Sequence, residues 1–317
     1  MTTDEIHAAF LRGVAATGCA AAGWTSASPA DAPEEKELAS WLGAGRHAGM
    51  SWLERHLELR RNPCSILEGA STILSLAFRF RQPERGSLPV AAYALGRDYH
   101  KAIKSRLRPL CGLIEAYFSA HTRICIDSAP LAERYWAFRA GVATPGRNGM
   151  ALVKGCGPYA FLAEIITDAD ISLFPPSPLP DSNYRCLECG ECIRHCPTGA
   201  LCADATVDAR RCLSYLSIEH DGDIPEEICR TAATEGAAFP LLGCDRCLAA
   251  CPLGKDADGT VIPDLQPRQS LATLTPQRLL AMTDEEIDEL RKGTALRRAS
   301  VEMLRRNARL ALTNFMK

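Results

Sequence analysis

The chain has 317 residues, a formal net charge of −2 and 47% hydrophobic against 23% charged residues. These are ordinary globular values, and the length predicts two or three structural units, because single cores average about 100 to 200 residues. No apolar stretch approaches the roughly 20 residues that cross a bilayer, and the acidic residues 1–5 are unlike a signal peptide. The sequence therefore predicts a cytoplasmic protein without membrane contact, whose cysteines serve metals or chemistry.

The first predicted element is a helix. Thr2 and Glu5 have capping-box spacing. Apolar residues then recur on one face, namely Ile6, Ala9, Phe10, Gly13 and Val14. Residues 25–33 are rich in Ser, Pro, Ala and Asp and predict a loop, and residues 71–78 predict the clearest strand.

The middle of the chain combines helices and strands. Residues 98–120 keep helical spacing, residues 122–126 resemble a short buried strand, and residues 131–140 resemble another helix. Residues 160–166 predict a strand or a helix entry. Asp127 thus stands where a strand ends and a helix starts, a position where ligands collect in α/β architectures. The alternative is that Asp127 only caps its helix.

The C-terminal part is helical and basic. Residues 174–180 form a proline-rich linker, Thr275 and Thr283 are helix-start signals, and Thr294 opens a last helix. The inner stripe of that helix is Leu296, Ala299, Met303, Asn307 and Leu310, and another face carries Arg298, Arg305 and Arg309. Residues 291–317 hold eight Lys or Arg against one Glu, which fits either a solvated face or nucleic-acid contact.

These observations predict an α+β protein of three units. Residues 1–175 form an α/β-type domain. Residues 176–265 form a double-cluster ferredoxin-like domain, and residues 266–317 form the basic helical segment.

Two cysteine runs carry the clearest chemical signal. They have the spacing of a two-cluster ferredoxin with one ligand missing, in which three cysteines hold one [4Fe-4S] cluster and the cysteine before proline binds the other. The first predicted cluster takes Cys186, Cys189, Cys192 and Cys251. The second takes Cys196, Cys244 and Cys247 and needs a fourth ligand. Structural zinc sites are the alternative, but zinc pairs usually stand alone.

The regular spacing puts the missing ligand at Leu241, which cannot bind iron. Cys202, Cys212 or Cys229 fills the site, or else the cluster has three irons. Cys212 is preferred because it precedes a predicted helix, whose amide end favours a thiolate cluster.

Segments outside the cysteine runs resemble epoxyqueuosine reductases in consistent order. They comprise residues 93–101, Asp127-Ser-Ala-Pro-Leu-Ala-Glu133-Arg134, residues 140–148, residues 161–168, Arg211-Cys212-Leu-Ser214-Tyr215 and residues 293–299. The resemblance implies a cobalamin-dependent enzyme with two [4Fe-4S] clusters that converts epoxyqueuosine to queuosine at the wobble position of tRNA. It implies that Asp127 is the catalytic acid and that Cys212 completes the second cluster.

Cofactor contacts follow from the same resemblance. The candidates are Arg61, Asp98, Tyr99, His100, Arg134, Arg147 and Ser214. No segment resembles the Asp-x-His-x-x-Gly motif, so base-off cobalamin without a protein histidine ligand is expected. Arg147 replaces a usual lysine, and the loop at residues 143–147 lacks the family's aromatic, which bears on the substrate.

The implied chemistry is coherent. Reductive opening of an epoxide needs two low-potential electrons and a proton. Clusters supply electrons singly, cobalt can accumulate both, and a protonated, buried carboxylic acid supplies the proton. The expected partners are a tRNA anticodon stem-loop and an external low-potential electron donor, and the chain is expected to be a monomer. Relatives often continue into a helical-repeat domain that grips tRNA, of which this chain has one or two helices.

Two other functions compete with this interpretation. One is a related cobalamin and iron-sulfur reductase that acts on a small molecule, as reductive dehalogenases do. The other is a ferredoxin-type module that carries electrons to a partner, which needs a smaller domain before the clusters than this chain has.

Overall fold

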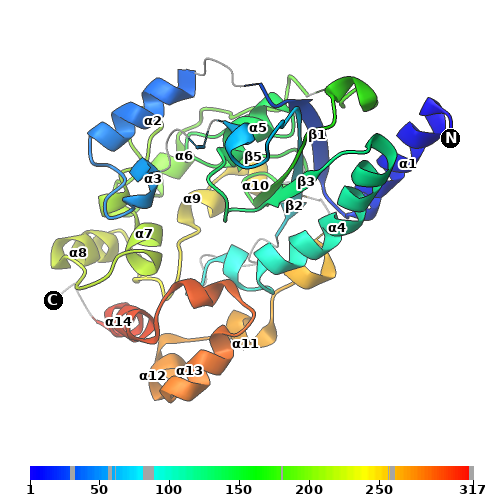
Figure 1. Ribbon diagram of the computed structural model, residues 1–317. Coiled ribbons are helices and arrows are strands. Elements are labelled where there is room, and N and C mark those ends of the chain that lie inside the picture. The colour runs from blue at the N-terminus through cyan, green and yellow to red at the C-terminus, as the bar shows by residue number, and fades with distance from the viewer. Residues whose placement is uncertain are drawn as a thin grey trace.

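The computed structural model describes residues 1–28, 33–55, 59–60, 62–80, 89–179, 181–255, 257 and 261–313. Its N-terminal half surrounds a sheet with helices (Figure 1). In chain order the elements are α1 (Thr3–Ala16), β1 (Ala21–Ser26), α2 (Pro33–Gly43), α3 (Trp52–Arg55), β2 (Thr72–Arg79), α4 (Tyr99–Phe118), β3 (Thr122–Cys125), α5 (Glu133–Arg139), β4 (Thr144–Pro145), β5 (Ala151–Leu152) and β6 (Ala160–Thr167).

The second half is helical in the described part of the chain. Its α-helices are α6 (Glu191–Arg194), α7 (Leu213–Ile218), α8 (Glu226–Thr234), α9 (Arg246–Ala249), α10 (Pro252–Lys255), α11 (Gln269–Ala272), α12 (Pro276–Ala281), α13 (Asp284–Arg291) and α14 (Val301–Leu312). Short 3-10 turns, such as Ala209–Arg211 and Ala295–Arg298, connect them. Thr275 and Thr283 cap α12 and α13, as predicted.

The main sheet has the strand order β1-β2-β6-β3, and every neighbouring pair is antiparallel. Helices α1 and α4 pack on one face through an apolar core that includes Phe10, Ile103 and Ile165. Helix α5 covers the other face, where Trp136 packs with Ile166. The predicted α+β class is confirmed. Asp127 follows the end of a strand, as predicted, but the rule for parallel α/β sheets does not apply to it, because antiparallel strands do not all end at one edge.

Two predicted elements differ from the structure. Residues 25–33 were predicted as loop, but strand β1 continues to Ser26 because it pairs with β2. The last helix does not start at Thr294. Thr294 caps a 3-10 turn, Ala299 is extended, and α14 starts afresh behind the cap Ser300. The residues 160–166 resolve as strand β6, which pairs with β2 along its whole length.

Packing joins the segments that the sequence divided into three units. Leu248, Ile262 and Leu265 belong to the same apolar core as α1 and α4. A second core packs the C-terminal helices against Val90 and Leu95. Apolar cores therefore continue across both predicted boundaries, after residue 175 and after residue 265. The boundaries themselves remain predictions. Within the described residues, no helix is long and apolar enough to cross a membrane.

Candidate active site and cluster region

Asp127 lies just beyond the edge strand β3, in a strained turn. Its φ of +53° is in the left-handed region, which costs a non-glycine residue of order 1 kcal/mol. Two contacts hold it there. The hydroxyl of Tyr99 donates a hydrogen bond to Asp127 Oδ2 at 2.5 Å, and the Asp127 backbone N–H donates to the Glu133 side chain. The Asp127 residue is exposed, so this anchored turn presents a carboxyl group to solvent.

Tyr99 is the first residue of α4, and the capped start of this helix fixes its backbone. The Asp98 side chain caps this helix by accepting the His100 backbone N–H at 3.1 Å. The Tyr99 ring is buried and stacks on Phe161 of β6, with ring centroids 4.3 Å apart and planes at 12°. Burial, and then the charge of Asp127, raises the pKa of the Tyr99 hydroxyl. Tyr99 therefore remains the donor in its bond to Asp127.

Two further carboxyls lie behind Asp127, and the sequence analysis assigned them no role. Glu133 begins α5, and burial raises its pKa to about 8, with Asp127 adding to the shift and Arg60 and Arg134 opposing it. Glu164 of β6 is fully buried. Burial, and then the charge of Glu133, raises its pKa well above the ordinary value. Both groups thus favour the protonated form near neutral pH.

Glu164 sits in a row of side chains beneath α5. The register pairs it with Ser75 of β2 and Cys125 of β3, and Ser75 Oγ donates to Glu164 Oε1 at 3.0 Å. Glu164 Oε2 has no hydrogen-bond partner among the described residues. The sequence does carry a signal for Glu164, since it is a single acid among the apolar residues 160–166. An acid in a buried strand must be neutral or paired, which marks Glu164 as a special position.

Among the predicted cofactor contacts, Tyr99 binds Asp127 directly, whereas several of the others interact with different partners. His100 Nδ1 lies 2.9 Å from Asp98 Oδ1, so these two residues interact with each other. Arg134 donates to the Gly149 carbonyl, and Arg147 Nη2 donates to the Ala203 carbonyl at 2.8 Å. The remaining candidates are Ser214, which lies two residues after Cys212, and Arg61, which lies outside the described residues.

The first cysteine set converges in one pocket. Its lining includes Cys186, Cys189, Cys192 and Cys251, together with Gly146 and Arg147. Burial raises the pKa of Cys192, and the charges of Cys186 and Cys251 raise it further. Burial also raises the pKa of Cys251, while the backbone N–H groups of Leu253 and Gly254 oppose that rise. Cys192 and Cys251 therefore meet here although 58 residues separate them in the sequence.

The second set includes Cys212. Burial raises the pKa of Cys247 well above its ordinary value, and three neighbouring thiols add to the shift, Cys244, Cys212 and Cys196. The pKa of Cys212 is likewise raised by burial and by Cys196, and is lowered by the amides of Ser214 and Tyr215. By contrast, burial and then Glu226 raise the pKa of Cys229. Cys212, rather than Cys229, thus lies with the other three cysteines.

These thiols suit an iron-sulfur cluster electrostatically. Burial raises the pKa of Cys244 to about 12, so this thiol would be neutral on its own. A metal centre compensates that penalty, because a coordinating thiol is deprotonated by the charge of the metal. Backbone N–H groups directed at Cys212, Cys244 and Cys251 add hydrogen bonds that stabilise thiolates.

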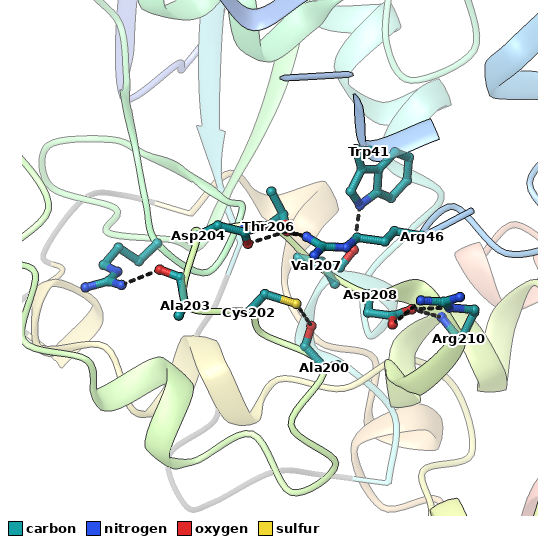
Figure 2. A network of polar contacts seen from close by, with 11 residues as sticks. Trp41, Arg46, Ala200, Cys202, Ala203, Asp204, Thr206, Val207, Asp208 and Arg210 are labelled. Atoms are coloured by element: carbon teal, nitrogen blue, oxygen red, sulfur yellow. Dashed lines mark hydrogen bonds and ion pairs between the residues drawn. The ribbon is translucent and has the colours of Figure 1, made fainter. Parts of the chain in front are cut away.

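The loop before Cys212 is braced by the N-terminal domain (Figure 2). The Trp41 indole donates to the Val207 carbonyl at 2.6 Å, and Arg46 Nη1 pairs with Asp204 at 2.7 Å. Arg46 also accepts the Ala209 N–H through its backbone carbonyl at 2.8 Å. These contacts place the 3-10 turn Ala209–Arg211, from which Cys212 follows directly.

A chain of contacts connects the second cysteine set with Asp127. Gly243 precedes Cys244, and a Cβ at Gly243 would lie 3.3 Å from Tyr93 Cε1, so the Tyr93 ring packs against this glycine. The Tyr93 and Tyr99 rings then make an edge contact at 6.3 Å. Burial, Asp245 and Asp127 together raise the pKa of the Tyr93 hydroxyl. The acid and the cysteines thus border the same region.

An antiparallel α+β domain with an anchored acid is joined to a region in which four cysteines line one pocket and four more interact electrostatically, which is the arrangement expected of an iron-sulfur oxidoreductase. Residues 185–254 match the family described as 4Fe-4S double cluster binding domain, and residues 60–128 match the family described as Epoxyqueuosine reductase QueG, DUF1730. The chain belongs to the epoxyqueuosine reductase family, as its curated relatives show. It is 34% identical to the Escherichia coli K12 enzyme over 292 residues, covering 88% of this chain and 74% of that protein. It is 35% identical to the Pseudomonas aeruginosa enzyme, covering 88% of this chain and 78% of that protein.

Solved structures agree with this assignment. An epoxyqueuosine reductase bound to an epoxyqueuosine-modified tRNA-Tyr stem loop matches with a TM-score of 0.84 and 26% identity, over 99% of this chain and 82% of that one. The Bacillus subtilis enzyme was captured with its catalytic aspartate loop swung out of the active site. It matches with a TM-score of 0.83 and 26% identity, over 99% of this chain and 82% of that one.

Proposed function

We propose that this chain reduces epoxyqueuosine to queuosine at the wobble position of tRNA, in the cytoplasm, with Asp127 as the proton donor. The observation that carries the proposal is the series of contacts from Cys244 through Gly243, Tyr93 and Tyr99 to Asp127. It brings a source of electrons and a source of protons to one region, and a reductive epoxide opening needs both.

Two [4Fe-4S] clusters are the proposed electron carriers. Cys186, Cys189, Cys192 and Cys251 would hold one, and Cys196, Cys212, Cys244 and Cys247 would hold the other. The electrostatic interactions among the thiols within each set support this ligand assignment. An external low-potential donor would reduce them.

Cobalamin is the proposed second cofactor. When bound, it would supply a cobalt centre that accumulates two electrons. The half-buried ring of Tyr93 offers part of an aromatic surface beside Asp127 and Cys244, which suits a flat and largely apolar macrocycle. Tyr93 and the backbone near Gly243 would contact it. Its occupancy would also shield Asp127 from solvent.

The residues of the chain would handle the proton. Asp127 would donate one proton to the departing epoxide oxygen, which leaves as water with a second proton from solvent, while the Tyr99 hydroxyl holds the carboxyl in position. Glu133 anchors the backbone of the same turn. The swung-out loop of the Bacillus subtilis enzyme supports a mobile turn at this position, and exposure of Asp127 would let water restore its proton.

A tRNA anticodon stem-loop is the proposed partner, supported by the stem loop bound to the solved relative. The basic C-terminal segment, residues 291–317, contributes less free charge than its sequence predicts. Arg298 pairs with Glu219 through two bonds of 2.8 and 2.7 Å, and Arg305 binds Asp284 at 2.6 Å. Arg309 is exposed and is the better candidate for phosphate contact.

The test is an anaerobic turnover assay. The chain is reconstituted with iron, sulfide and cobalamin, and is given an anticodon stem-loop carrying epoxyqueuosine with a strong reductant. Nucleoside mass spectrometry should show queuosine. A protein that holds about eight irons and cobalamin yet leaves the nucleoside unchanged would overturn the proposed substrate.

A further inference from the structure

The hydroxyl of Tyr159 is buried without a hydrogen-bond partner. Tyr159 is 0% exposed, and its Oη contacts no donor or acceptor within the described residues. A buried hydroxyl in that state destabilises the fold, and phenylalanine would fill the same space without the penalty. The Tyr159 hydroxyl therefore lacks a hydrogen-bond acceptor among the described residues, and a bound cofactor could supply one.

The Tyr159 ring is fixed on all sides. Its backbone N–H donates to the Cys156 carbonyl, and its carbonyl accepts the Phe80 N–H, both at 3.1 Å. The Phe80 ring meets the Tyr159 ring edge-on at 5.6 Å. A Cβ on Gly254 would lie 2.8 Å from Tyr159 Cε2, the carbon next to the hydroxyl-bearing one. The hydroxyl end of the ring therefore lies against the turn that follows Cys251.

That end of the ring lies between the two cysteine sets. Burial raises the pKa of the Tyr159 hydroxyl, and Asp245, Cys247 and Cys251 raise it further when they are ionised. Cys247, which belongs to the second set, packs against the apolar core that contains Tyr159, while Cys251 belongs to the first set. The hydroxyl is thus a neutral donor next to groups that become anionic when they bind iron.

We propose that Tyr159 Oη donates a hydrogen bond to a sulfur of the cluster held by Cys196, Cys212, Cys244 and Cys247, and thereby raises the reduction potential of that cluster. The inference rests on the ligand assignment proposed above. Hydrogen bonds to sulfur set cluster potentials, because a donor stabilises the more negative reduced state more than the oxidised state. The hydrogen bond from Tyr159 would make this cluster easier to reduce than it would be without the bond.

The test compares Tyr159→Phe with the wild-type protein after anaerobic reconstitution of the full chain. Redox titration followed by electron paramagnetic resonance should show one midpoint potential falling in the variant. A tenfold loss in the equilibrium constant for reduction corresponds to about 59 mV for a one-electron couple. Cys212→Ser, which perturbs the second cluster, identifies which signal belongs to it. Unchanged potentials at full iron content, or a shift of the other cluster alone, would overturn the proposal.

Tyr184→Phe is the matched control. Tyr184 also lies near Cys251, and burial raises its pKa to about 12, but its hydroxyl already donates to the Val153 carbonyl at 2.9 Å. Its replacement should leave both potentials at the wild-type values. An equal shift in Tyr184→Phe would indicate a nonspecific effect and would count against the role of Tyr159.

A second measurement needs no altered ligand. Electron-nuclear double resonance on the reduced wild-type protein should detect an exchangeable proton coupled to the second cluster, which Tyr159→Phe lacks. Absence of this proton in the wild-type protein would overturn the proposal even if the variant failed to bind iron. A wild-type protein that assembles neither cluster would refute the ligand assignment instead, which separates the two failures.

Discussion

Tyr99 and Asp127, 28 positions apart in the chain, are joined by a hydrogen bond of 2.5 Å between the first residue of α4 and the turn after β3. The donor is buried and stacked on Phe161, whereas the acceptor is exposed. A fixed donor beside an exposed acid gives the carboxyl a preferred position while leaving it accessible. The candidate active site is organised around this pair.

Replacement of Asp127 by asparagine should abolish proton donation and keep the shape of the turn. Because positioned acids contribute roughly 10²- to 10⁴-fold, turnover of the modified stem-loop should fall by about that factor. Iron content and stem-loop affinity should stay at wild-type levels. Turnover of Asp127→Asn at the wild-type rate would remove Asp127 from the mechanism.

Glu133 should make stability depend on pH. Its pKa is raised to about 8 in the folded state, so between about pH 4.5 and 8 the unfolded chain releases a proton that the folded chain retains. The free energy of unfolding should therefore decrease with rising pH through this window, by up to about 1.4 kcal/mol per pH unit. The groups facing Glu133 are Asp127, Arg60, Arg134 and Glu164.

The control for this prediction is Glu133→Gln, which keeps an acceptor for the Asp127 N–H and cannot ionise. Denaturant unfolding at several pH values should show that the difference in stability, variant minus wild type, grows as the pH rises from 5 to 8. A constant difference would mean that Glu133 titrates normally.

Cys212→Ser should remove one cluster. The variant should bind about four irons instead of about eight, because one set retains only three thiols. Cys202→Ser and Cys229→Ser are the controls and should keep the full iron content. If either control loses a cluster while Cys212→Ser does not, the fourth ligand has been misassigned.

Gly157→Ala should loosen the junction between the two halves of the molecule. Gly157 has a φ of +59°, and a Cβ there would lie 2.4 Å from the Leu253 carbonyl oxygen. The strain of the positive φ and the clash with the Leu253 carbonyl together should lower the free energy of unfolding by about 3 kcal/mol.

Gly236→Ala separates the two contributions. Gly236 has a similar φ of +66° with nothing within 4 Å of its Cβ position, so only the strain of about 1 kcal/mol applies. Thermal or denaturant unfolding should rank the wild type above Gly236→Ala and Gly236→Ala above Gly157→Ala. Equal losses in the two variants would show that the contact with Leu253 does not restrict Gly157.

Arg309 and Arg305 should respond differently to charge reversal. Arg305→Glu should lower stability, since Arg305 binds Asp284 and the Met282 carbonyl. Arg309→Glu should leave stability unchanged and weaken binding of the stem-loop, with the slope of log affinity against log salt reduced by about 0.7 to 0.9. An unaltered slope for Arg309→Glu would limit α14 to a structural role.

The sequence by itself determined the features that depend on local spacing. Two-residue gaps and a following proline are enough to predict cluster-binding cysteines, because one turn of chain presents three thiols to the same centre. Capping signals located the starts of α1, α12 and α13, and Asp98 caps α4. The choice of Cys212 from three candidates came from the helix that follows it.

Only the tertiary structure decided which distant side chains meet. Tyr99 reaches Asp127, Glu164 pairs with Ser75 and Cys125, and the Tyr159 ring packs against Gly254, through strand register and packing between elements far apart in the chain. The same packing paired Arg298 and Arg305 internally and broke the predicted last helix at Ala299. Such contacts depend on which faces become buried together, and that information is absent from any single segment.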